Sequence, residues 1–341
     1  MAPARSSSVD VAKGLGIALV VFGHNRIVLR GGDDGLLFGL IFAFHVPLFF
    51  FLAGLFVRPA DALPGFVRAK ADSLLKPYFV VLVGLGIVLA AGQWRQGGLS
   101  AAWLLGYVAG VLHGGGGSIE WTPLWFLPCL FLVSVLGLLL LKLARSPLAI
   151  GLVALASLGL GLALLGQVPP QPWSADLAPI CLAFFLLGHG GRERVVNMRF
   201  SLPGLALLGL AFALLNWPPA PHVDLNLRVL QAPWLAVPRA LVGIGLCLQL
   251  ACLLGRWPAA AASLASIGSG SLFILLFHGI VQGKVAHTAG RLIGNVVAGD
   301  LLGFAAGIAL PLLLLQLVAR VPLLARLLLP LPKRRALNAE R

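Results

Sequence analysis

The sequence predicts an all-α membrane protein, a polytopic bundle of about ten transmembrane helices with both termini in the cytoplasm. Of its 341 residues, 59% are hydrophobic and only 11% are charged, whereas soluble domains carry roughly 45–50% apolar and about 25% charged residues. Apolar runs of about 18 residues or more recur along the chain, as spanning helices require. The basic residues lie in short clusters between these runs, which is typical of cytoplasmic loops. A membrane β-barrel would show short alternating segments instead.

Hydropathy and loop charge together set the number of spans. One further apolar run, 99–112, is short and is followed by Gly114 to Gly117, so hydropathy alone does not decide whether it crosses. If it crossed, the basic clusters at 142–145, 192–199 and 333–335 would all face outward. The positive-inside rule therefore favours ten spans, with 99–112 as an interfacial or re-entrant helix on the outer side. The candidate spans are 11–30, 36–57, 77–93, 123–142, 147–166, 177–190, 201–216, 239–254, 263–283 and 299–319.

The remaining composition excludes several classes of protein. The net charge is +14, but no aromatic–basic platform or DNA-binding motif accompanies it, so we expect no nucleic-acid partner. The four cysteines lie within apolar runs without CxxC spacing, which predicts buried hydrophobic side chains and no metal site. The first run lacks a small-x-small cleavage site and contains His24, so we expect an uncleaved helix. We expect one transmembrane domain, 1–330, and a short basic cytoplasmic tail, 331–341.

The first helix carries the most conspicuous polar residues. Lys13 and His24 are eleven positions apart, so at 100° and 1.5 Å per residue they share a face within about 20° and lie about 16 Å apart. Asp10 precedes Lys13 by three residues and can pair with it. This helix thus has a cation near the cytoplasmic surface and an imidazole near the outer surface. Each also has a simpler interpretation: Lys13 as a topology anchor, and His24 as an interfacial histidine.

The second helix begins with a histidine at the same predicted depth. His45 follows Phe44 on the outer side, where the first helix ends, so the hairpin brings His24 and His45 together. Because imidazole titrates near neutrality, such a pair suits proton transfer. His45 can equally orient His24, bind an acceptor, or cap its helix.

A basic amphipathic segment leads into the third span. Its cations are Arg68, Lys70 and Lys76, and the last of these opens Lys76-Pro77-Tyr78. One interpretation is a loop held against anionic lipid headgroups. The other is a phosphate clamp for a cofactor such as coenzyme A, since Lys and Arg are natural phosphate partners. Charge alone does not separate the two.

Three further residues are candidates for binding a substrate. Glu120 is a lone acid beside an aromatic cluster that includes Trp125, at the predicted outer interface. Tryptophans there are commonly belt anchors, which is the alternative for this cluster. His278 lies deep in a late helix, where a polar side chain is costly and therefore a functional candidate.

These motifs occur in an order that resembles the acyltransferase 3 family of integral membrane acyltransferases, and within it the fucose 4-O-acetylase-like branch. The family's hallmark is Arg/Lys-x10-His in the first helix, here filled by Lys13 and His24. Lys keeps the charge but lacks the bidentate fork of arginine. The other matching motifs are Phe44-His45-x-Pro47, Lys76-Pro77-Tyr78, Leu124-Trp-Phe-Leu127 and Ser271…His278.

The resemblance implies a multi-pass protein of the bacterial inner membrane that O-acylates, usually O-acetylates, an exported or cell-surface glycan. The donor would be acyl-CoA, with no tightly bound cofactor, and membrane lipids and the glycan would be the other partners. Lys13, Arg68, Lys70 and Lys76 would hold the nucleotide phosphates. His24 would serve as a general base or as a transient acyl carrier. The rival interpretations are a transporter or flippase for a glycan or lipid-linked substrate, and a non-catalytic sensor.

Overall fold

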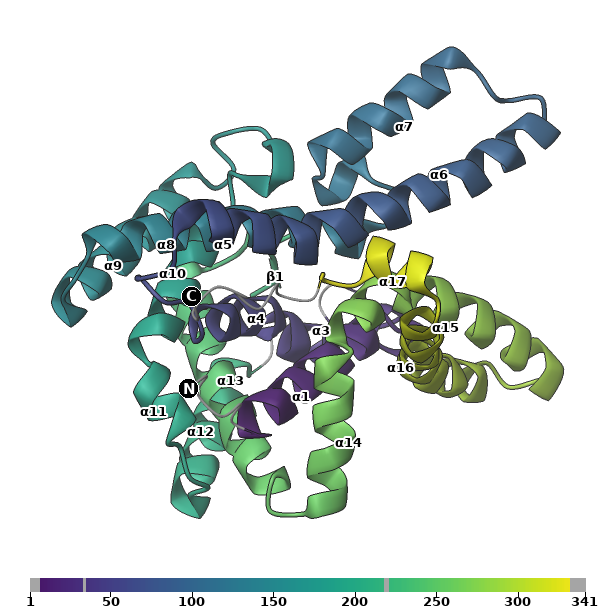
Figure 1. The fold of residues 1–341 in the computed structure, drawn as a ribbon. Coiled ribbons are helices and arrows are strands. Elements are labelled where there is room, and N and C mark those ends of the chain that lie inside the picture. Colours follow the sequence, from purple (N-terminus) through teal and green to yellow (C-terminus); the bar gives the residue numbers. More distant parts are fainter. Residues whose placement is uncertain (1–6, 33–34, 218–220, 332–341) are drawn as a thin grey trace, which may run out of the picture.

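The computed structural model describes residues 7–32, 35–217 and 221–331, and these form a bundle of helices with one short hairpin (Figure 1). From position 332 onward, the predicted basic tail lies outside the described residues. Within the described ranges, eight helical segments are long and apolar enough to cross a membrane, so the chain is a multi-pass membrane protein. They are Leu36–Gly54, Leu63–Arg95, Thr122–Leu143, Pro147–Leu164, Pro172–Gly190, Pro233–Leu254, Ser271–Ile293 and Val296–Arg320.

The elements follow one another in a simple order. They are α1 (Ser7–Gly23), α2 (Arg26–Leu29), α3 (Leu36–Phe42), α4 (His45–Gly54), α5 (Leu63–Lys70), η1 (Ala71–Leu75), α6 (Lys76–Arg95), α7 (Ala101–His113), η2 (Gly116–Ser118), η3 (Thr122–Trp125), α8 (Phe126–Leu143), α9 (Pro147–Leu164), η4 (Pro172–Ser174), α10 (Ala178–Gly190), α11 (Arg192–Val196), α12 (Leu202–Leu215), β1 (Val223–Asp224), β2 (Val229–Leu230), α13 (Pro233–Leu254), α14 (Pro258–Ser269), α15 (Ser271–Ile293), α16 (Val296–Arg320) and α17 (Pro322–Leu328).

Each of the eight long segments overlaps one of the ten predicted spans, but several boundaries differ. The predicted span 11–30 is interrupted after Gly23, because the side chain of Asn25 caps a new short helix, α2. The predicted span 263–283 is divided at Gly270 between α14 and α15. The run 99–112 forms the helix α7. The count of ten spans and the cytoplasmic termini stay predictions.

Helix α1 runs through the centre of the bundle and packs backbone to backbone on α14 (Figure 1). A Cβ atom at Gly14 would collide with the backbone of Leu264, and one at Gly268 would collide with the carbonyl of Asp10. Small residues permit this kind of close approach between membrane helices. The contact holds the segment that carries Lys13 in a fixed place.

The basic segment does not form one regular helix. Between α5 and α6 the backbone makes a π-helical segment, η1, which turns the side chains on either side of it in different directions. Lys76 donates hydrogen bonds to Asp72 Oδ1 and to the carbonyl of Leu329, each at 2.6 Å. Lys76 is therefore tied to the end of α17.

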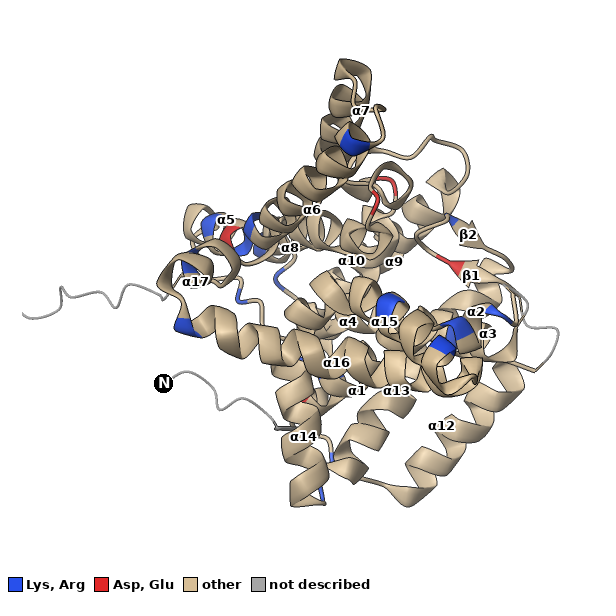
Figure 2. Cartoon of the chain, turned by 90° about the vertical axis from the view of Figure 1, so that its right-hand side faces the viewer, with Lys and Arg blue, Asp and Glu red and all other residues tan. Residues whose placement is uncertain are grey.

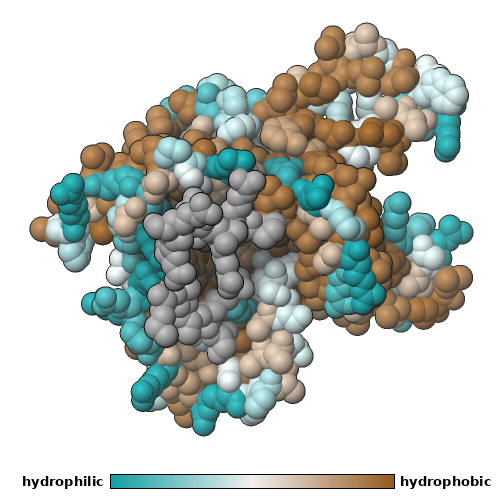
Figure 3. All heavy atoms as spheres, in the orientation of Figure 1, coloured by the Kyte–Doolittle hydropathy of each residue, from teal (hydrophilic) through white to brown (hydrophobic). Residues whose placement is uncertain are grey.

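Helices α6 and α7 form a hairpin that extends away from the rest of the bundle (Figure 1). The Tyr78 hydroxyl donates to the carbonyl of Val111 at 2.7 Å, and the Tyr107 hydroxyl donates to that of Leu82 at 2.6 Å. Apolar side chains cover most of the visible hairpin surface (Figure 3). Acidic and basic residues occur at few places on the ribbon, with one group around α5 (Figure 2). This is the distribution expected where lipid is the solvent.

Candidate active site

A cavity of about 350 Å³ extends along α1. We call it the long cavity. Lys13, Ile17, Val20 and His24 line it at spacings of four, three and four residues, which is one face of a helix. The prediction that Lys13 and His24 share a face is therefore confirmed, and the two side chains belong to opposite ends of one cavity wall.

The other walls come from segments far apart in the chain. Helix α4 contributes His45 and several apolar side chains, while α5 contributes Lys70. The entry to α8 contributes Trp125, which is buried. The lining beyond α1 comprises Phe42, His45, Val46, Phe49, Leu52, Ala53, Phe56, Lys70, Leu74, Thr122, Pro123, Trp125, Phe126, Leu127, Leu130, Asp224, Leu225, Asn226, Ser271, Leu272 and Leu275.

Two lysines give one end of the long cavity its positive charge. Lys13 Nζ lies 3.9 Å from Asp10 Oδ1, as its spacing predicted, and 5.6 Å from the centre of the Phe56 ring. Lys70 comes close enough for the two ammonium groups to repel each other. The other two predicted phosphate ligands lie elsewhere: Arg68 is exposed and does not line this cavity, and Lys76 is bound to Asp72.

The three predicted histidines share one hydrogen-bond arrangement. Nδ1 of His24 lies 2.8 Å from the carbonyl oxygen of Val20, and Nδ1 of His45 lies 2.9 Å from that of Ile41. His278 repeats the pattern on α15 with a carbonyl four residues earlier. Because a carbonyl only accepts, each Nδ1 carries the proton. Each neutral ring therefore presents an unprotonated Nε2, the atom that a general base needs.

His24 lies beside His278, a contact that the sequence analysis did not predict. The centroids of the His24 and His278 rings are 5.4 Å apart. Between His24 and His45 stands Phe42, whose ring centroid is 6.1 Å from His24 and 4.7 Å from His45. His24 and His45 do line the same cavity, but an aromatic ring contacts both of them.

Glu120 and Trp125, each predicted to bind a substrate, line different cavities. Trp125 lines the long cavity, whereas Glu120 lines a cavity of about 540 Å³ beside α6 and α7, together with Tyr107. Thr122 touches both cavities. The structure thus separates Glu120 from the histidines.

Asp224 is a site residue that the sequence interpretation missed. It lies on β1, in the segment between α12 and α13, and lines the long cavity. Burial raises the pKa of the Asp224 carboxyl, while the backbone N–H of Leu227 and the nearby His222 and His24 partly oppose that rise. The available signal was a group of polar residues, 222–228, between two apolar spans.

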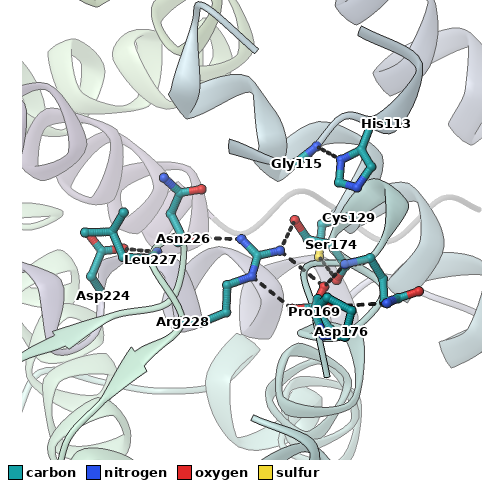
Figure 4. A network of polar contacts seen from close by, with 11 residues as sticks. His113, Gly115, Cys129, Pro169, Ser174, Asp176, Asp224, Asn226, Leu227 and Arg228 are labelled. Atoms are coloured by element: carbon teal, nitrogen blue, oxygen red, sulfur yellow. Dashed lines mark hydrogen bonds and ion pairs between the residues drawn. The ribbon is translucent and has the colours of Figure 1, made fainter. Parts of the chain in front are cut away.

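Two arginines hold the Asp224 segment in place. Arg228 makes a bidentate pair with Asp176, with nitrogen–oxygen distances of 2.9 and 3.2 Å, and also donates to Ser174 Oγ (Figure 4). The side chain of Arg239 is fully buried and donates to Asn216 Oδ1 at 2.8 Å. It also reaches the carbonyls of Pro221 and Gly39. Charge-assisted bonds of this kind fix the β1–β2 hairpin over the long cavity.

Comparison with known families decides the class of this protein. Residues 6–320 match the Acyl_transf_3 model, which describes an acyltransferase domain. The chain belongs to the acyltransferase 3 family. The comparisons with curated proteins and with solved structures gave no match.

The matched region of this acyltransferase contains every residue that lines the long cavity. The family assignment therefore applies to the segment in which Lys13 and His24 are brought together. Membership in the fucose 4-O-acetylase-like branch stays a prediction.

Proposed function

We propose that this protein is an O-acyltransferase of the bacterial inner membrane that moves an acyl group, foremost acetyl, from acyl-CoA to a hydroxyl of an exported or cell-surface glycan. One observation carries the proposal: a single cavity has Lys13 in its wall at one end and His24 at the other. The eleven residues between them correspond to about 16 Å of helix. The cavity thus separates a cationic binding region from a site for chemistry.

The cationic end suits the phosphates of the donor. Lysine is a compact charge with three donors, and it binds phosphate well without bidentate geometry. Lys13 and Lys70 supply two such charges at the wall of one cavity. Between them and His24 the lining is mostly apolar, with Ile17 and Val20 as examples, so a thin pantetheine arm can lie there and bring the thioester to the histidine.

The proposed reaction uses Nε2 of His24 as a general base. Nε2 takes the proton of the acceptor hydroxyl as its oxygen bonds to the thioester carbonyl carbon. The carbon–sulfur bond breaks, and the leaving thiolate takes a proton from the His24 imidazolium. Atoms and charge balance without any further reactant. Transfer through an acyl-His24 intermediate is the alternative, and it uses the same Nε2 atom.

The test uses the full chain in lipid nanodiscs with radiolabelled acetyl-CoA and envelope glycan as the acceptor. We expect label on glycan hydroxyls with the native protein and none with His24→Ala, while both proteins insert equally. Normal transfer by His24→Ala would end the proposal. Movement of unmodified glycan across the bilayer without label would instead support a transporter.

A second measurement separates the two roles of His24. The native protein is incubated with labelled acetyl-CoA alone, denatured rapidly at neutral pH and treated with neutral hydroxylamine, which cleaves an acyl-imidazole but leaves an oxygen ester. We expect no stoichiometric label on the protein, since a general base forms no covalent bond to the acyl group. Label on native protein that is absent from His24→Ala would establish the acyl carrier.

A further inference from the structure

A second cavity, of about 190 Å³, meets the long cavity at His24. We call it the small cavity. Both cavities are lined by His24, Thr122 and Pro123, so these residues form the partition between them. The small cavity is otherwise lined by Asn25, Arg26, Trp121, His278, Gly279, Gln282, Gly283 and Ala286.

Three polar atoms of the small cavity are buried without a hydrogen-bond partner. They are Trp121 Nε1, His278 Nε2 and Gln282 Oε1. His278 and Gln282 are more than nine-tenths buried. An unpaired buried polar group costs about 1–3 kcal/mol, and native structures contain few of them. Three around one cavity can be satisfied together by one polar ligand that binds there.

The chemical role of each atom follows from its neighbours. Nδ1 of His278 donates to backbone carbonyls, so Nε2 of the neutral ring accepts. The amide nitrogen of Gln282 donates to the carbonyl of His24 at 3.0 Å, so Oε1 also accepts. The indole nitrogen of Trp121 only donates. The ligand must therefore offer two hydrogen-bond donors and one acceptor.

The required pattern matches hydroxyl groups rather than an anion. A carboxylate or fully ionised phosphate has no hydrogen to give to His278 or Gln282. The cation that lines the small cavity, Arg26, faces the buried carboxylate of Asp300, with Arg26 Nε 4.0 Å from Asp300 Oδ1. Arg30 pairs with the same carboxylate. The two acceptors therefore favour a neutral ligand that carries several hydroxyls over an anion.

Trp121 supplies a flat wall for such a ligand. Its ring lies against α15 at Gly279, where a Cβ atom would collide with the indole, and its centroid is 5.8 Å from that of His278. One water molecule needs about 10–15 Å³ of cavity volume. The small cavity, at about 190 Å³, therefore has room for a ligand of several heavy atoms.

We infer that the small cavity is the acceptor subsite, which binds a neutral, polyhydroxylated sugar unit through Trp121, His278 and Gln282 and directs one hydroxyl to His24 from the side opposite the thioester. This inference rests on the proposed acyl transfer. It assigns donor and acceptor to two cavities that meet at one imidazole. The two substrates can then be bound together, so that the acyl group passes directly between them.

The experiment uses full-length protein in nanodiscs with acetyl-CoA and methyl α-D-glucopyranoside as the neutral probe. The variants are Trp121→Phe, which keeps the ring and removes the N–H, Gln282→Leu and Gly279→Ala. Matched controls are Trp94→Phe and Gln316→Leu, at exposed positions on α6 and α16. We expect Trp121→Phe and Gln282→Leu each to raise the KM for the glucoside roughly tenfold, as loss of one hydrogen bond implies, and Gly279→Ala to raise it by displacing the indole of Trp121. The KM for acetyl-CoA should not change in the site variants, and both control variants should keep the native KM for the glucoside and the native rate of acetyl-CoA hydrolysis.

A binding readout makes the test independent of turnover. The glucoside should raise the melting temperature of the native protein and of both controls, but not that of Gln282→Leu. Glucose 6-phosphate should raise the melting temperature of the native protein less than the glucoside does. Unchanged glucoside KM in all three site variants, or a preference for the phosphorylated sugar, would overturn the acceptor subsite while leaving acyl transfer intact. Native protein that never consumes acetyl-CoA would instead overturn the proposed function.

Discussion

The ring centroids of His24 and His278 lie 5.4 Å apart, and each ring donates its Nδ1 proton to a backbone carbonyl four residues earlier. Both imidazoles are therefore locked in the same tautomer, with Nε2 available. One ring belongs to α1 and the other to α15, so the pair exists only in the folded bundle.

Replacing His278 tests the role of this pair. His278→Phe keeps an aromatic ring next to His24 and removes the Nε2 acceptor. We expect the rate of transfer to glycan to fall about tenfold or more, while hydrolysis of acetyl-CoA by water persists. Steady-state measurement of both reactions checks this. Equal loss of both would show that His278 acts only through packing.

The lysines of the basic segment should differ in their effect on the donor. Lys70→Met should raise the KM for acetyl-CoA more than Lys76→Met does, because Lys70 lines the long cavity and Lys76 is tied to Asp72 and Leu329. Lys76→Met should instead lower thermal stability. Titrations with acetyl-CoA and melting curves of the two variants test this prediction. A larger rise in KM for Lys76→Met than for Lys70→Met would place the phosphates of the donor beside Lys76 instead.

Asp224 predicts a pH dependence of stability. Burial raises its pKa in the folded state, so the folded protein holds this proton more tightly than the unfolded chain, where the pKa is about 3.9. The contribution of Asp224 to stability is therefore fully present below that value, and it is lost as the pH rises through the folded pKa. Asp224→Asn should remove the loss. The melting temperature of the variant minus that of the native protein should increase over this pH range and then level off; a flat difference contradicts the prediction.

Arg239 should be a major determinant of stability. Arg239→Met removes the donor to the buried Oδ1 of Asn216 and to the part-buried carbonyls of Pro221 and Gly39, of which the Gly39 carbonyl still accepts from the backbone N–H of Ala43. Because an unsatisfied buried group costs about 1–3 kcal/mol, we expect a loss of at least that size in the free energy of unfolding and a displaced Asp224 segment. Arg256→Met, at an exposed cation stacked on Phe200, serves as the matched control. Equal unfolding curves for the two variants would contradict this.

The topology is testable without any activity measurement. If α7 does not cross the membrane, the loop around Ser146 lies in the cytoplasm. A reporter fused at that position should be active only as a cytoplasmic enzyme. Periplasmic activity there would add one crossing before α8 and reverse all later loops.

The sequence predicted the helical membrane fold and the shared face of Lys13 and His24, because both follow from periodicity and hydropathy along one segment. It did not predict the His24–His278 contact, which depends on how α1 packs against α15. It missed Asp224, because the fold brings a loop residue over the cavity only through the Arg228 and Arg239 anchors. It grouped Lys70 with Lys76, because a π-helical segment has no strong compositional signal.

The π-helical segment Ala71–Leu75 makes the donor-binding region sensitive to chain length. A π turn accommodates one residue more than an α turn, so deleting one residue between 71 and 75 would restore a regular helix. The part of the segment before the deletion, including Lys70, would then rotate by about 100° relative to α6. A single-codon deletion there would thereby turn Lys70 away from the long cavity, while Lys76 keeps its place at the start of α6.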